Sequence, residues 1–122
     1  MSLLKMGPRV KLAELIQKLS LDVRSAKDSL QREVTGGYAS DLLSDVLAHS
    51  KEGNIWVTLQ VHHNIVAVAS MKDLVGIILV SGREPEQETI DKAEKENLVI
   101  MVTEMPTFEL VGRLYNLGVT GM

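Results

Sequence analysis

The sequence predicts a three-layer α/β domain in which helices cover both faces of a mainly parallel sheet of about four strands. Segments rich in β-branched residues alternate with segments whose apolar residues have helical spacing. Roughly 20 residues separate one strong strand from the next, which is the spacing of βαβ units. Aromatic residues make up only 3% of the 122 residues, whereas apolar residues make up 45%. Because the core must therefore be aliphatic, layers of sheet and helix are favoured over an aromatic-anchored β-sandwich.

The N-terminal part is expected to contain one helix and one brief strand. Residues 1–9 show no periodicity, and we expect them to form a flexible N-terminus that can include residues left from cloning. Residues 10–120 are expected to form a single domain. Apolar side chains recur at helical spacing over residues 12–19, with charged residues on the opposite side. Residues 21–24 alternate between apolar and charged, which predicts a short first strand.

The middle of the chain is expected to contain a turn, two helices and a strand. Two adjacent glycines within residues 35–38 predict a turn that leads into a helix over residues 42–47, closed by Gly53. Residues 55–59 are dense in β-branched and aromatic side chains and predict a strand. A further helix is expected to open near Asn64.

The last part of the chain repeats the alternation. Residues 76–80 and 98–102 carry no polar side chain, which predicts strands buried on both faces, as parallel strands are. Between them, Pro85 is expected in the first turn of a helix that ends at Asn97. The last helix is expected to use Thr107 as its N-cap and to stop at Gly118.

Charge and composition argue against several classes of function. The net charge is −3 and both signs are interspersed, so we expect no nucleic-acid partner. No apolar run approaches the roughly 20 residues of a membrane-spanning helix, and we expect neither a signal peptide nor a membrane contact. The absence of cysteine excludes disulfides, thiol catalysis and cysteine-based zinc or iron–sulfur sites. It favours a cytoplasmic location, and no cofactor is expected.

Ligands of open parallel sheets bind beyond the carboxyl ends of the strands, where loops and helix N-termini meet. We expect the glycine-bearing loops to share this rim and to form a crevice whose backbone amides hold an anion. The candidate ligand-binding residues are Thr35, Gly36, Gly37, His62, Asn64, Ser81, Gly82 and Arg83. Two plainer interpretations stay open. The glycine pair would only permit a tight turn, and Arg83 would only pair with Glu84 or Glu86.

No catalytic or metal-binding residues are identified. His62 and His63 are adjacent, and neighbouring side chains in a strand point to opposite faces, so they should not chelate one ion. His49 is expected on a different helix. Asp41 and Asp45 are four residues apart, which can suit magnesium, but we interpret them as a solvated helix surface. Phosphate-binding loops, dinucleotide fingerprints and serine-nucleophile elbows are absent from the sequence.

Several segments resemble stand-alone bacterial members of the DRTGG domain family, over about residues 12–118. The segment Glu33-Val34-Thr35-Gly36-Gly37-Tyr38 is similar to the signature after which the family is named, with Glu33 in place of Asp and Val34 in place of Arg. The other similar segments are residues 38–47, 64–69, 76–79 and 107–115.

The resemblance implies a fold related to the N-terminal domain of HPr kinase/phosphorylase, without that enzyme's catalytic domain. Family members also occur fused to CBS pairs in regulated pyrophosphatases and to phosphate acetyltransferases, which implies regulation and subunit contact. No catalytic residues are carried over. Loss of the signature arginine at Val34 weakens phosphate binding by that loop.

We therefore expect a non-catalytic regulatory or ligand-sensing domain that binds an adenine nucleotide or another small anion and forms a homodimer. The alternative is a structural adaptor that dimerises or docks on a partner enzyme. A small phosphotransferase has the least support in the sequence. The sensor hypothesis in this form requires Gly37 and Gly82 to lie along one rim of the sheet.

Overall fold

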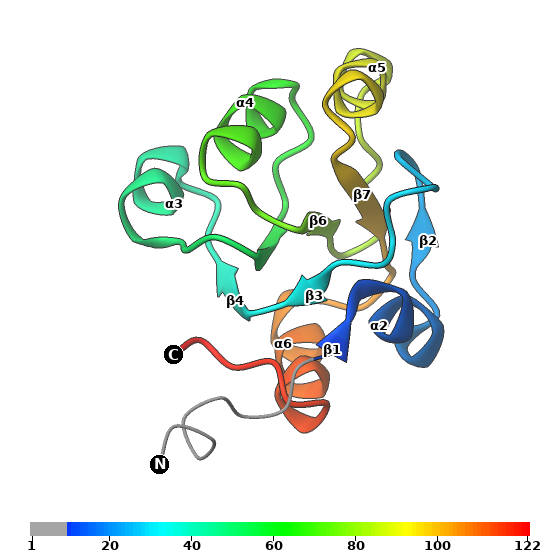
Figure 1. Ribbon diagram of the computed structural model, residues 1–122, viewed down its shortest axis with the longest axis vertical. Helices are drawn as coiled ribbons and strands as arrows, with labels where there is room; N and C mark the ends of the chain where they lie inside the picture. Colours follow the sequence, from blue (N-terminus) through cyan, green and yellow to red (C-terminus); the bar gives the residue numbers. More distant parts are fainter. Residues whose placement is uncertain (1–9) are drawn as a thin grey trace.

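The computed structural model describes residues 10–122 and has a five-stranded sheet in the order β2-β7-β6-β5-β4 (Figure 1). Its strands are β2 (Asp22–Val23), β4 (Gly36–Ala39), β5 (Asn54–Thr58), β6 (Gly76–Leu79) and β7 (Val99–Val102). Strands β4 to β7 are parallel, and only β2 is antiparallel to its neighbour β7. The predicted fold class is confirmed, with one strand more than expected.

Helices cover both faces of the sheet (Figure 1). One face carries α3 (Leu43–His49), α4 (Asn64–Met71) and α5 (Gln87–Glu96), and the other face carries α2 (Leu12–Leu19) and α6 (Thr107–Asn116). None of the helices within residues 10–122 has the length and apolarity needed to cross a bilayer.

The side chains of the central strands alternate between two apolar cores. Ile55 and Val57 contribute to the core under α2 and α6, whereas Trp56 contributes to the core under α3 to α5. Every residue of β5, β6 and β7 is buried, which is why β6 and β7 are uninterrupted apolar runs and why β5 has polar residues only at its two ends, Asn54 and Thr58. Burying the large ring of Trp56 leaves no unsatisfied donor, because its Nε1 donates to Ser40 O at 2.8 Å.

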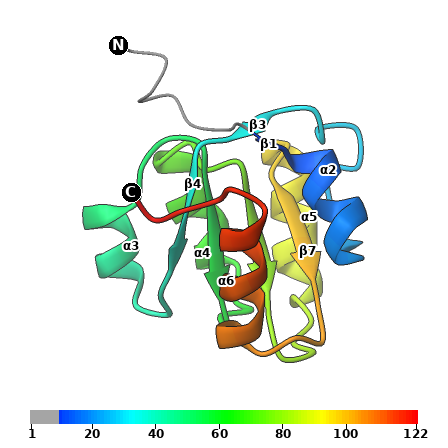
Figure 2. The same cartoon turned by 90° about the horizontal axis from the view of Figure 1, so that it is seen from below.

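A second, two-stranded antiparallel sheet was not expected from the sequence. It pairs β1 (Val10–Lys11) with β3 (Glu33–Val34), as Figure 2 shows beside α2. Two-residue strands carry too few residues for a period-2 pattern to be visible. The expectation of a flexible segment over residues 1–9 falls outside the residues that the structure describes.

The turn predicted at residues 35–38 is wrong, because Gly36 and Gly37 lie inside strand β4. Gly36 and Gly37 are needed there for close packing. A Cβ on Gly36 would lie 2.9 Å from Thr120 O, and one on Gly37 would lie 3.4 Å from both Ile55 and Val119. The glycines therefore let the C-terminal segment approach the strand (Figure 2).

Two predicted helix starts are displaced by one or two residues. The N-cap of α5 is Glu86, so Pro85 precedes the helix and does not occupy its first turn. Thr107 is the first residue of α6, and the N-cap is Pro106. The predicted stop at Gly118 agrees with the structure. Gly118 directly follows the C-cap of α6 and has a φ of +97°, the left-handed conformation that often ends a helix.

Candidate functional site

The eight predicted site residues separate into two groups, which lie at opposite ends of the parallel strands. Gly36 pairs with Asn54, the first residue of β5, so the group of Thr35, Gly36 and Gly37 lies at the amino ends of the strands. The other five follow the last residues of β5 and β6 and lie at the carboxyl ends. The predicted crevice with all eight residues along one rim is therefore wrong. We expected Gly36 and Gly37 to follow a strand, whereas they are the first two residues of β4.

The amides of Ser81, Gly82 and Arg83, in the loop after β6, are not free to hold an anion. Ser81 N donates to Met105 O, Gly82 N to Thr103 O and Arg83 N to Val80 O, at 2.9 to 3.1 Å. Ser81 and Gly82 have φ values of +58° and +72°, so the chain reverses tightly here. The Glu104 carboxylate would lie 2.9 Å from a Cβ on Gly82. An anion at this turn would meet satisfied donors and a negative charge.

The interpretation that Arg83 pairs with Glu84 is also wrong. Glu84 accepts two hydrogen bonds from Arg24, at 2.8 and 2.9 Å, and this fork connects the end of β2 to the loop before α5. The hydrogen bond raises the pKa of Arg24 and lowers that of Glu84. Among residues 10–122, Arg83 has no ion pair.

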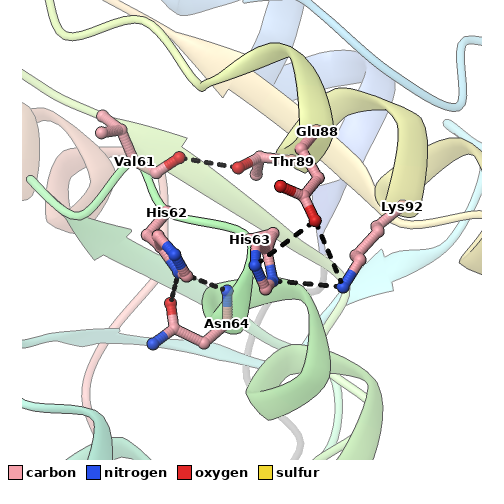
Figure 3. A network of polar contacts seen from close by, with 7 residues as sticks. All are labelled: Val61, His62, His63, Asn64, Glu88, Thr89 and Lys92. Atoms are coloured by element: carbon pink, nitrogen blue, oxygen red, sulfur yellow. Dashed lines mark hydrogen bonds and ion pairs between the residues drawn. The ribbon is translucent and has the colours of Figure 1, made fainter.

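His62 and His63 do not point to opposite faces as expected. They lie in the turn before α4 and not in a strand, and their ring centroids are 4.1 Å apart (Figure 3). The Nε2 of His63 is 3.4 Å from Glu88 Oε2, and its Nδ1 is 3.2 Å from Lys92 Nζ. Within the described residues, no group of three side chains is arranged to hold a metal ion.

The N-terminus of α4 is also closed to an anion. Asn64 N donates to His62 Nδ1 at 3.2 Å, Ile65 N to His62 O and Val66 N to His63 O. The anion-binding role predicted for His62 and Asn64 depended on free backbone N–H groups at the start of α4. Because these groups already have acceptors, they do not support that role.

Two adjoining cavities lie instead at the other group, on either side of the C-terminal segment. The polar cavity has a volume of about 300 Å³ and faces α3, and the apolar cavity has a volume of about 270 Å³ and faces α6. Both are lined by Tyr38, Thr120 and Gly121. The polar cavity also contains Thr35, Gly36, His49, Lys51, Glu52, Asn54 and Met122. The apolar cavity also contains Gly37, Ala39, Val57, Val111, Leu114, Tyr115 and Val119.

Asn54 sets the shape of the polar cavity. Its side chain is buried, accepts a hydrogen bond from Lys51 N at 2.9 Å and donates to Thr35 Oγ1 at 3.3 Å. The hydroxyl of Thr35 donates in turn to Glu52 O at 2.8 Å. The loop between α3 and β5 is therefore tied to the start of β4. Among the described residues, the ammonium of Lys51 has no ion-pair partner.

A carboxylate on α3 orients two further side chains of this edge. Asp45 Oδ1 accepts from the Tyr38 hydroxyl at 2.8 Å and lies 2.9 Å from His49 Nδ1. The hydrogen bond from Tyr38, with contributions from Ser40 and His49, lowers the pKa of Asp45. The same hydrogen bond raises the pKa of Tyr38. With Nδ1 held by Asp45, His49 has Nε2 left to meet a ligand in the polar cavity.

Asp41 and Asp45 do not form the solvated pair that their spacing indicated. Asp41 precedes α3 and caps the end of β5, because its Oδ1 accepts from Thr58 Oγ1 at 2.8 Å and from Leu59 N at 2.7 Å. Asp45 lies on the helix and faces β4. Each carboxylate is engaged by a different strand, so the two do not share a cation.

Sequence reasoning missed Tyr38, Lys51 and Asn54, and it considered His49 and Asp45 only for metal binding. The spacing of Asp45 and His49 on one helix was the available signal, since residues four apart lie on the same face. Nothing in the sequence places Lys51 beside Thr35, because that contact depends on the pairing of β4 with β5.

The fold and these cavities define a small α/β domain with two adjoining hollows beside β4, the edge strand of a mainly parallel sheet. Comparison with protein-family models and with curated proteins finds no match. Among solved structures, the fold is similar to a crystal structure of the CBS and DRTGG domains of the regulatory region of Clostridium perfringens pyrophosphatase, complexed with its activator diadenosine tetraphosphate. The TM-score is 0.67 and the sequence identity is 19%.

The similarity covers 85% of this chain and 45% of that chain, so the present chain spans less than half of the regulatory region. At 19% sequence identity, the similarity between the two structures shows a shared fold. It agrees with the resemblance to the DRTGG family predicted from the sequence.

Proposed function

We propose that the chain is a regulatory domain that senses an adenine nucleotide or a related small anion in the two cavities beside β4, the edge strand of its sheet. The observation that carries the proposal is the contact between an apolar cavity and a polar cavity across three shared residues. Ligand sites of this kind combine an apolar lining with a few polar groups that set orientation. A nucleotide has the same division into a flat base and a charged phosphate.

The base would occupy the apolar cavity, between the small residues of β4 and the aliphatic face of α6. Gly37 and Ala39 leave room above the sheet, and Tyr115 offers an aromatic ring at the margin. The phosphate would lie in the polar cavity, where the ammonium of Lys51 can donate to it. The Nε2 of His49 can donate as well only when the imidazole is protonated, because Nδ1 already donates to Asp45. Glu52 also lines this cavity and opposes the anion.

The likeness to an enzyme's regulatory region supports a sensor that acts on a partner enzyme and is not itself catalytic. In that pyrophosphatase region the activator is an adenine nucleotide, and we propose the same ligand class here. We also propose that the protein acts as a homodimer. A cytoplasmic location stays a prediction from the sequence.

Thermal-shift titration with AMP, ATP and diadenosine tetraphosphate tests the ligand. We expect at least one of them to raise the melting temperature, because a ligand that binds only the folded state stabilises it by mass action. A flat response to all three at millimolar concentration would refute the nucleotide proposal.

Matched variants test the location of the site. Lys51→Ala should weaken binding about tenfold, which corresponds to the loss of one charge-assisted contact of about 1.4 kcal/mol. Ala39→Leu should weaken it by filling the apolar cavity, and Glu52→Gln should strengthen it. Lys27→Ala removes an exposed lysine far from the cavities and is the control. Equal affinity in Lys51→Ala, Ala39→Leu and the control would place the ligand elsewhere.

A further inference from the structure

The imidazole of His49 is held at one of its two ring nitrogens. Nδ1 is 2.9 Å from Asp45 Oδ1, which also accepts a hydrogen bond from the Tyr38 hydroxyl at 2.8 Å. That hydrogen bond lowers the pKa of Asp45, so near neutral pH the carboxylate is ionised and can only accept. Nδ1 must therefore carry a hydrogen, and the lone pair of the neutral ring lies on Nε2. Among the described residues, Nε2 has no hydrogen-bond partner.

His49 lines the polar cavity, so the protonation state of its Nε2 decides what this cavity can hold. A bare Nε2 presents a lone pair, which repels the oxygens of a phosphate. A protonated Nε2 presents a positive charge and a hydrogen-bond donor, and charge-assisted hydrogen bonds are the stronger ones. The charge of an imidazole ordinarily changes between about pH 5 and about pH 8. The His49 side chain is 67% exposed, so protons reach it from solvent.

The charged and titratable groups around His49 come from three parts of the fold. Asp45 lies one turn earlier on α3, and Tyr38 lies on β4. Lys51 and Glu52 line the cavity from the loop between α3 and β5, and the C-terminal segment lines it with no titratable side chain. The charges of Lys51 and Glu52 offset each other, whereas a bound anion would add negative charge beside His49. The anion therefore favours the protonated ring, and by reciprocity the protonated ring favours the anion.

We propose that the polar cavity takes up one proton together with its anion, and that His49 is the residue that receives the proton. This inference rests on the proposed function, because it concerns the regulation of the same site. The protein then binds a phosphate-bearing ligand more tightly as the pH falls. A sensor of this kind responds to acidification even when the ligand concentration is constant.

The other two histidines of the chain provide an internal comparison. His62 and His63 lie in the turn before α4, and neither lines the two cavities. His63 instead contacts Glu88 and Lys92 of α5 (Figure 3). The protonation of His62 and His63 should therefore not depend on an anion beside His49.

Calorimetric titration at pH 6, 7 and 8 tests the coupling, with diadenosine tetraphosphate and inorganic sulfate as the probes. Neither probe gains or loses a proton in this range, unlike AMP and ATP, whose terminal phosphates titrate near roughly pH 6. We expect the affinity for a probe to be about tenfold higher at pH 6 than at pH 8, the effect of one charge-assisted contact. Repeating the titration in buffers of different ionisation enthalpy should show net uptake of protons on binding.

A matched pair of variants tests the assignment to His49. His49→Asn removes the titratable ring, while the asparagine amide can still donate to Asp45 in place of Nδ1. We expect this variant to lose both the pH dependence and the proton uptake, and to keep its fold because position 49 is exposed. His63→Asn is the control and should keep both properties.

Nitrogen-15 NMR of the imidazole rings at pH 7 locates the proton directly. Either probe should shift His49 toward the doubly protonated ring and leave His62 and His63 unchanged.

An affinity that is the same at pH 6 and at pH 8 would overturn the proton coupling and leave the proposed function intact. A wild-type pH dependence in His49→Asn would overturn the assignment to His49. If neither probe binds at any of the three pH values, this inference is overturned as well, and the titrations with AMP and ATP decide the proposed function by themselves.

Discussion

Individual polar side chains complete the hydrogen bonds that the sheet leaves open. Within residues 10–122, every buried side-chain nitrogen and oxygen has a partner. Several of these partners are backbone groups far away in the sequence, as with Trp56 and Ser40 or Asp41 and Leu59. Such contacts stabilise the fold mainly because losing one partner leaves the other buried and unsatisfied.

Ser25 is the clearest case. It is fully buried, its hydroxyl donates to Leu98 O at 2.8 Å, and it accepts from Ile100 N at 2.9 Å, which closes the edge of β7 next to β2. Ser25→Ala removes both bonds, and we expect it to lower the free energy of unfolding by about 1–3 kcal/mol. Urea unfolding followed by Trp56 fluorescence measures the change.

The matched control for that experiment is Ser44→Ala, which changes an exposed serine on α3. It should shift stability by less than about 0.5 kcal/mol. If the two substitutions lower the free energy of unfolding equally, the hydrogen bonds of the Ser25 hydroxyl do not stabilise the fold.

Asp45 makes the stability depend on pH. Its pKa is lowered in the folded protein, chiefly by the hydrogen bond from Tyr38 and then by those from Ser40 and His49. A depressed carboxyl pKa contributes stability that is present above the ordinary value of about 4 and is lost as pH falls through the folded value. The pKa of Tyr38 is raised instead, so its contribution to the free energy of unfolding is fully present below its ordinary pKa of about 10 and is lost only as the pH rises above that value.

We therefore expect Asp45→Asn to be less stable than the wild type near neutral pH, and the difference to shrink as the pH falls below about 4. Urea unfolding at several pH values between 3 and 7 would measure it, with Asp91→Asn, at an exposed position of α5, as the control. A difference that is constant over this range would mean that the charge of Asp45 is not what stabilises the fold.

At the scale of single elements, the sequence predicts an element well where many residues share one environment. The fully buried strands β5, β6 and β7 and the helices α2 and α4 were located within one or two residues. Their periodicity or unbroken apolar character reflects burial on one or both faces.

Strand β4 could not be predicted, because two of its four residues are glycines that carry no side chain to show a pattern. The error had a large consequence for the site. Treating Gly36 and Gly37 as the turn after a strand placed them at the carboxyl edge, whereas the strand they begin runs from the amino edge. Thr35, Gly36 and Gly37 line the two cavities, but the residues that surround them there depend on strand order, which the sequence does not give.

At the scale of the whole molecule, the C-terminal segment joins the α6 layer to the edge strand. Val119 is buried in the core under α6, and Thr120 O accepts from Gly37 N at 2.9 Å. The segment thereby protects part of the outer edge of β4, which would otherwise offer its backbone to another chain. It also separates the two cavities, so any change in its position alters both.

Gly36→Ala tests this arrangement, because its Cβ would lie 2.9 Å from Thr120 O and 3.2 Å from Asn54 Nδ2. We expect the segment to be displaced, with a loss of about 1–3 kcal/mol in unfolding free energy and faster hydrogen exchange at the Gly37 amide. Gly121→Ala is the control in the same segment, since its Cβ would meet its nearest neighbour only at 3.8 Å. If Gly36→Ala leaves both stability and Gly37 exchange unchanged, the segment does not clamp β4.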